Sequence, residues 1–182
     1  MRRKVGLMVA LLAVSACATD YRTQSAGAIA AAVSINDNAF SSVRNYSAPP
    51  IHNGTGWGMT YSAMLVASQD KKTQGVEHSL LVRWTYVDRQ WAFFNAATLP
   101  GGTPLSLLTA ERAVSSCREN LCTYAESYVI PLPLELLAGA KDGLQIAFNG
   151  QLGQYVVSLP ASYVLGYLSG VAAALTPAAG GQ

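Results

Sequence analysis

The residues whose types and spacing could do chemistry are few: the three cysteines and two histidines of this sequence, and Glu126. Cys117 and Cys122 are separated by four residues, whereas His52 and His78 stand far from each other and from the cysteines. No spacing among them resembles a zinc motif, and the sequence contains no G-x-S-x-G nucleophile elbow. We therefore expect no metal and no cofactor, and no sequence motif identifies a catalytic residue.

Cys17 ends a stretch that has the order of a secretory signal peptide. Basic residues at positions 2–4 precede an uncharged apolar run at 5–13, and small residues then lead into the cysteine. Val14-Ser15-Ala16-Cys17 resembles the lipobox of bacterial lipoproteins, in which the signal peptide is cut before the cysteine and the cysteine carries the lipid. The apolar run is shorter than the ~20 residues that a spanning helix needs. The resemblance implies that residues 1–16 are a cleaved signal peptide and that Cys17 is lipidated.

The same resemblance implies a location and a partner. Ala18 after the cysteine is compatible with transfer to the outer membrane, because an aspartate there is the usual signal for retention at the inner membrane. We expect a domain that faces the periplasm and is held by several acyl chains, which anchor more stably than one. Cleavage also removes three of the twelve basic residues and leaves nine against ten acidic ones. No basic footprint for nucleic acid then remains.

Once Cys17 is assigned to lipid, Cys117 and Cys122 form an even pair in an exported protein. Export places the pair in an oxidising compartment, where a disulfide is expected. A bond that closes so short a loop contributes about 2 kcal/mol of stability. A redox pair is the alternative, but four intervening residues and no thioredoxin-like context favour a structural disulfide.

Glu126 lies between Tyr124 and Tyr128 on one face of an expected strand. Pairing of the two cysteines predicts a register that places Ala113 opposite Glu126 and Glu111 opposite Tyr128. A carboxylate among aromatic side chains, facing a residue too small to cover it, is a candidate ligand or ion-pair site. The alternative is an exposed acid, or an ion pair with Arg83 or Arg112.

The elements that must position these side chains are mostly strands. Residues 17–35 are expected to be a lipidated tether with at most a short helix, and residues 36–59 to be irregular around one ordered piece near 40–46. The expected strands are 59–68, 76–87, 91–97, 105–117, 122–130, 144–148 and 154–159, with a hairpin turn at Asn149-Gly150. A short helix is expected at 133–140, and residues 177–182 are expected to be a flexible tail.

Two patterns predict which faces are buried. Leu80, Val82, Trp84 and Tyr86 alternate with polar positions and belong in the core by period two. From Pro160 onward, apolar residues recur at helical spacing and predict an amphipathic helix, whose small residues Gly166, Gly170 and Ala173 could let it approach the sheet closely. These four core residues and three small residues are the positions on which the packing depends.

These observations together predict a mainly β fold, an antiparallel β-sandwich or partly open barrel of seven or eight strands, over residues 36–176. The expected function is a membrane-anchored envelope lipoprotein that acts as a binding or accessory module for a protein partner or an envelope component. An enzyme acting on an envelope polymer is the first alternative, and a thiol-redox protein is the second. An enzyme is less expected than a binding module, because no catalytic motif follows Cys17.

Overall fold

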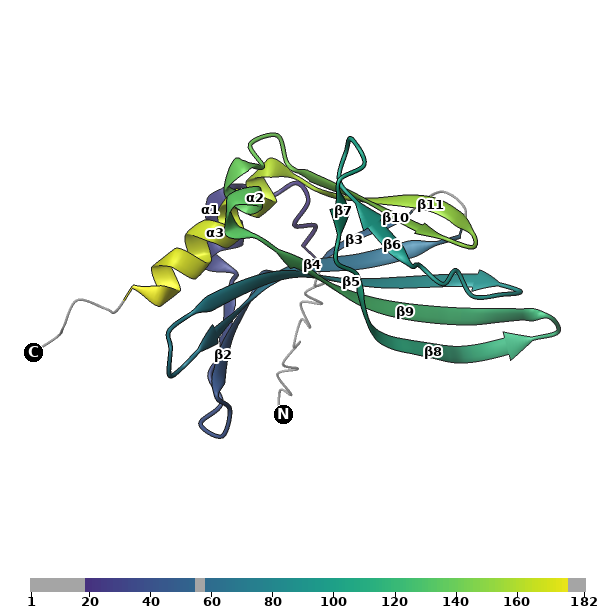
Figure 1. Ribbon diagram of the computed structural model, residues 1–182, viewed down its shortest axis with the longest axis horizontal. Coiled ribbons are helices and arrows are strands. Elements are labelled where there is room, and N and C mark those ends of the chain that lie inside the picture. The colour runs from purple at the N-terminus through teal and green to yellow at the C-terminus, as the bar shows by residue number, and fades with distance from the viewer. Residues whose placement is uncertain (1–18, 55–57, 177–182) are drawn as a thin grey trace, which may run out of the picture.

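The computed structural model describes residues 19–54 and 58–176. Within these residues, eleven strands and three helices form two antiparallel sheets with the helices at one end (Figure 1). The mainly β, antiparallel prediction is confirmed, and the sheets do not close into a barrel. The predicted signal peptide, Cys17 and the C-terminal tail lie outside the described residues.

The larger sheet has seven strands in the order β1-β2-β4-β5-β9-β8, and β3 also pairs with β4. In Figure 1 this sheet arches from β2, at lower left, over β4 and β5 to β8, at lower right. Its strands are β1 (Ser34–Asn36), β2 (Val43–Ser47), β3 (Ile51–Gly54), β4 (Thr60–Asp70), β5 (Val76–Asp88), β8 (Leu108–Arg118) and β9 (Leu121–Leu132).

The smaller sheet and the helices lie above this arch in the same view. The sheet has the order β11-β10-β6-β7. Its strands are β6 (Ala96–Thr98), β7 (Pro104–Leu105), β10 (Leu144–Gly150) and β11 (Gly153–Leu159). The helices are α1 (Ala26–Ala31), α2 (Leu134–Gly139) and α3 (Ala161–Leu175).

The core lies between the two sheets, as the alternation in β5 predicts. All four inward residues of that strand are at most 3% exposed. Trp84 is at the centre of an aromatic cluster, with ring centroids 5.1 to 5.8 Å from those of Tyr61, Phe94, Phe148 and Tyr155. Aromatic pairs at this spacing stabilise a core beyond the area they bury. The predicted number of seven or eight strands is too low. β1, β3 and β7 are too short for the alternation of apolar and polar residues to reveal them.

In the described part of the expected tether, residues 19–35, the short helix expected in the alanine run is present as α1, and it packs as part of the folded domain. Ser25 caps α1 by accepting a hydrogen bond from the backbone N–H of Ala28. Ile29 of this helix is fully buried, and β1 then pairs with β2. The alanine run looked like a linker because it has only one large apolar residue, and the partner that buries this residue is about 140 positions away, in α3.

The small residues of α3 approach α1 and not the sheet. A Cβ on Gly166 would stand 2.6 Å from the carbonyl oxygen of Ala26, and one on Gly170 would stand 2.8 Å from that of Ala30. The two helices therefore pack nearly backbone to backbone. The buried face of α3 therefore includes both glycines, and Leu165, on another face, is 47% exposed.

Residues 91–95 are irregular, although a strand was expected over 91–97. The backbone N–H groups of Ala92 and Phe93 donate to Glu126 and not to a neighbouring strand. The same segment crosses β10, where a Cβ on Gly150 would stand 2.4 Å from the carbonyl oxygen of Ala92. Gly150 therefore continues the strand, and the turn falls at residues 151–152, two positions after the expected one.

Candidate functional site

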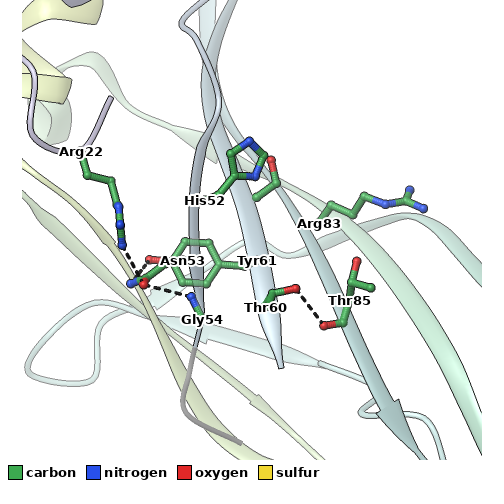
Figure 2. Close-up of a pocket in the computed structure, with 9 residues that line it drawn as sticks. Arg22, His52, Asn53, Gly54, Thr60, Tyr61, Arg83 and Thr85 are labelled. Atoms are coloured by element: carbon green, nitrogen blue, oxygen red, sulfur yellow. Dashed lines mark hydrogen bonds between the residues drawn. The ribbon is translucent and has the colours of Figure 1, made fainter. Parts of the chain in front are cut away.

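The outer face of the larger sheet, opposite the aromatic core, carries three adjoining hollows along β5. We call them together the furrow. The first, the cationic hollow, has a volume of about 440 Å³ and lies at the β3 end of the sheet (Figure 2). Arg22, His52 and Arg83 line it, and the rest of its lining contains no carboxylate. The lining also includes Asn53, Gly54, Thr60, Tyr61, Ser62 and Thr85.

The second hollow, the apolar slot, has a volume of about 320 Å³ and shares Ser62 and Arg83 with the cationic hollow. Most of its lining is hydrophobic. The hydrophobic lining residues are Pro50, Met64, Leu81, Val82, Ala110, Tyr128 and Val129. Ser127 and the two shared residues complete the lining. The slot thus lies at the centre of the arched sheet, where strands β4, β5, β9 and β8 run side by side.

The third hollow, the far hollow, has a volume of about 590 Å³ and shares Val129 with the slot. It lies at the other end of β5, where Glu77, Leu108 and Leu134 contribute to its lining. Each hollow shares a residue with the next, so the three hollows follow one another along the outward residues of β5. Leu81, Arg83 and Thr85 share the outward face of this strand by period two. No sequence signal marks a hollow there, because the curvature of the sheet depends on all its strands together.

Two exposed ion pairs border the cationic hollow. Arg22 donates to Asp20 and, through Nη1, to the side-chain oxygen of Asn53 at 2.8 Å, as Figure 2 shows for Asn53. The hydrogen bonds from Arg22 lower the pKa of Asp20 to about 2. Arg83 pairs with Glu111 of β8 at 3.1 Å, with both side chains about half exposed. Exposed pairs of this kind contribute little to stability, so Arg83 can exchange its partner at small cost.

Glu126 is fully buried and cannot meet a ligand in this state. Arg112 Nε lies 3.1 Å from its carboxylate, and Tyr86 and Tyr128 both donate their hydroxyl protons to it. Burial, and then the hydrogen bond to Glu126, raises the pKa of each tyrosine above its ordinary value. Both hydroxyls therefore remain protonated donors near neutral pH.

The predicted register around Glu126 is wrong. Arg112, not Ala113, lies opposite it, and Thr109, not Glu111, lies opposite Tyr128. Register shifts in β8 between residues 114 and 116 and between 109 and 111 cause the difference, because each adds an unpaired residue to that strand. Of the two alternatives, the exposed acid is wrong, and the structure has the ion pair with Arg112, because the bulge between Val114 and Ser116 brings this arginine opposite the carboxylate. Tyr124 does not contact Glu126 among the described residues, and instead packs on Tyr86 and Trp91.

The predicted disulfide lies away from the furrow, whereas His78 lines the far hollow. The sulfurs of Cys117 and Cys122 stand 2.00 Å apart at the end of the β8–β9 hairpin. His78 is 9% exposed, and its Nδ1 lies 2.7 Å from the hydroxyl oxygen of Tyr167. Burial lowers the pKa of this histidine. Within the described ranges, no group of three or more His, Cys, Asp or Glu residues could hold a metal.

Comparison of the chain with protein-family models, with curated protein sequences and with solved structures found no match. In the described part of the chain, no helix is long and apolar enough to cross a membrane.

Proposed function

We propose that this protein is a membrane-anchored envelope lipoprotein whose domain acts as a binding module, with the furrow as its binding surface. The lipobox-like sequence at Cys17 supports the anchor, and the same resemblance, with Ala18, supports the outer membrane and the periplasm. A protein or another envelope component is the partner class.

One observation carries the binding role. The outer face of a two-sheet fold is normally a solvated polar surface, whereas here it is hollowed along its central strand and lined by apolar side chains. Met64, Leu81 and Val129 point outward and are partly exposed. Apolar side chains kept at a concave surface favour a role in recognition, because an exposed hollow of this kind adds nothing to the core.

Photo-crosslinking in cells that make the lipidated protein tests this proposal. A photoreactive amino acid replaces Leu81 in the apolar slot, and a matched variant carries it at Val156, an exposed residue of the smaller sheet. We expect a recurrent adduct from position 81 and none from position 156. Equal labelling from both positions would contradict the furrow as the binding surface. So would the absence of any adduct at position 81 together with turnover of an envelope polymer by the purified protein.

A further inference from the structure

The polarity and charge of the side chains that line the furrow differ between its two ends and its middle. Its β3 end is lined by Arg22, His52 and Arg83, its middle is apolar, and its far end carries Glu77. A ligand that fits this sequence of environments has an anionic head and an apolar body. The lining of the far hollow includes Glu77 and His78 but no arginine or lysine, so an anionic group there would lie near a carboxylate without an arginine to bind it.

Arg83 is the residue that joins the polar and apolar parts, since it lines both hollows. Its Nη1 donates to Glu111 at 3.1 Å and to the hydroxyl of Ser127 at 3.4 Å. Among the described residues, no group accepts a hydrogen bond from its Nε or Nη2. These N–H groups are free to bind an oxygen of an anionic head, and the exposed pair with Glu111 competes only weakly.

The length of the furrow suits one extended acyl chain. Its outward positions on β5 run from Thr85 to Glu77, which at ~3.3 Å per residue is about 26 Å. The cationic hollow, of about 440 Å³, is many times the ~30 Å³ share of one water molecule, and so is larger than a carboxylate alone needs. Thr60, Ser62 and Thr85 add hydroxyl groups there that suit a polar head with hydroxyls of its own.

The position of the anchor brings this end of the furrow to the membrane. Arg22 follows Cys17 by five residues, a span of at most about 18 Å when fully extended, and it is held to β3 by Asn53. A lipid on Cys17 would therefore keep the cationic hollow close to the bilayer surface. Amphiphiles that leave the bilayer would meet the hollow first.

We propose that the furrow binds a lysophospholipid, with its anionic headgroup in the cationic hollow and its single acyl chain along the apolar slot. The inference rests on the proposed function, because the anchor supplies the nearness to the membrane. It adds to that function the class of ligand that the furrow binds.

Calorimetric titration of the purified full chain carrying Cys17→Ser tests the proposal, with palmitoyl lysophosphatidylglycerol below its micelle concentration as the probe. We expect Arg83→Gln to weaken binding about fivefold, as loss of a charge-assisted hydrogen bond would. Leu81→Glu should weaken it about tenfold or more, because it places a charge in the slot. The matched controls are Arg89→Gln, at an exposed turn position, and Leu165→Glu, on the exposed side of α3, and both should bind as the parent does.

Two further probes identify the head, and both carry the same acyl chain. Monopalmitoylglycerol lacks the charge and palmitate lacks the glycerophosphate, so both should bind more weakly than the lysophospholipid. Equal or tighter binding of either would overturn the assignment to a lysophospholipid. No binding of any of the three, together with a protein adduct from position 81, would overturn the lipid inference and leave the proposed binding function standing. Failure of both experiments would overturn both proposals.

Discussion

Gly166 of α3 lies so close to Ile29 of α1 that a Cβ built on the glycine would stand 2.7 Å from the Cβ of the isoleucine. The contact ties the N-terminal part of the described chain to its last helix. It is the reason that residues expected to form a tether are part of the folded domain. The orientation of the domain relative to the proposed anchor therefore depends on this helix pair.

Gly166→Ala should destabilise the protein by about 1–3 kcal/mol, because the new methyl group meets backbone and the helices must separate. Urea unfolding measures the difference. The control is Gly27→Ala in α1, where a Cβ meets nothing within 4 Å. That substitution should be neutral or stabilising by up to about 1 kcal/mol, the helix propensity difference. Equal effects at the two glycines would contradict the close packing of α1 on α3.

Glu126→Gln should destabilise the protein by about 3–5 kcal/mol. The substitution removes the buried charge that pairs with Arg112, and it turns an amide donor toward groups that are themselves donors. Thermal unfolding is the measurement. Glu111→Gln is the matched control, because it removes an arginine-paired carboxylate that is 59% exposed, and should change stability by less than about 0.5 kcal/mol. A small effect at both positions would refute the structural role of Glu126.

The sequence was sufficient to predict β5 and the long β8–β9 pair, because local patterns define both. Residues 80, 82, 84 and 86 alternate strictly, and the cysteines are five positions apart at the hairpin end. Arg112 was one of two arginines expected as an ion-pair partner of Glu126, but the sequence could not decide between them. Two bulges in β8 shift the register, and no local composition marks them. One shifted residue exchanges Ala113 for Arg112 and changes an uncovered acid into a buried ion pair.

The furrow and α1 were beyond the sequence for a related reason. Ile29 is buried by glycines about 140 positions later, and the apolar slot combines side chains from β4, β5, β8 and β9. The spacing of apolar residues along a strand or helix predicts only which of its faces is buried. Where a sheet curves, and which distant helix covers a lone isoleucine, depends on contacts far apart in the chain.

Replacing both Cys117 and Cys122 by serine should cost about 2 kcal/mol, the loop-entropy contribution of so short a closed loop, and leave the fold intact. Denaturant unfolding of the variant against the parent measures the cost. Thiol titration of the native parent should find the pair oxidised and resistant to mild reductant. Facile, reversible reduction would instead favour the thiol-redox alternative.

The stability of the folded domain should fall as the pH is lowered below about 6.5. Burial lowers the pKa of His78 in the folded state, so the unfolded chain takes up a proton first and unfolding is favoured. The contribution is fully present above the ordinary histidine pKa of 6.5 and is lost as the pH falls toward the folded value. Stability measured between pH 7 and pH 5 should show this slope, and His78→Gln should flatten it.

Cys17→Ser should abolish lipid labelling and release the protein from membranes, because the proposed anchor is a covalent lipid on that side chain. Labelling with a radioactive fatty acid and fractionation of cells measure the two effects. The unfolding midpoint should not change, because the substitution leaves the core contact of Tyr21, the hydrogen bond from Arg22 to Asn53 and the packing of α1 in place. The variant with serines at both 117 and 122 is the matched control: it also loses thiols, but it should stay lipidated and membrane-bound. Membrane retention of Cys17→Ser would contradict the lipoprotein proposal, and with it the argument that the anchor holds the cationic hollow at the bilayer.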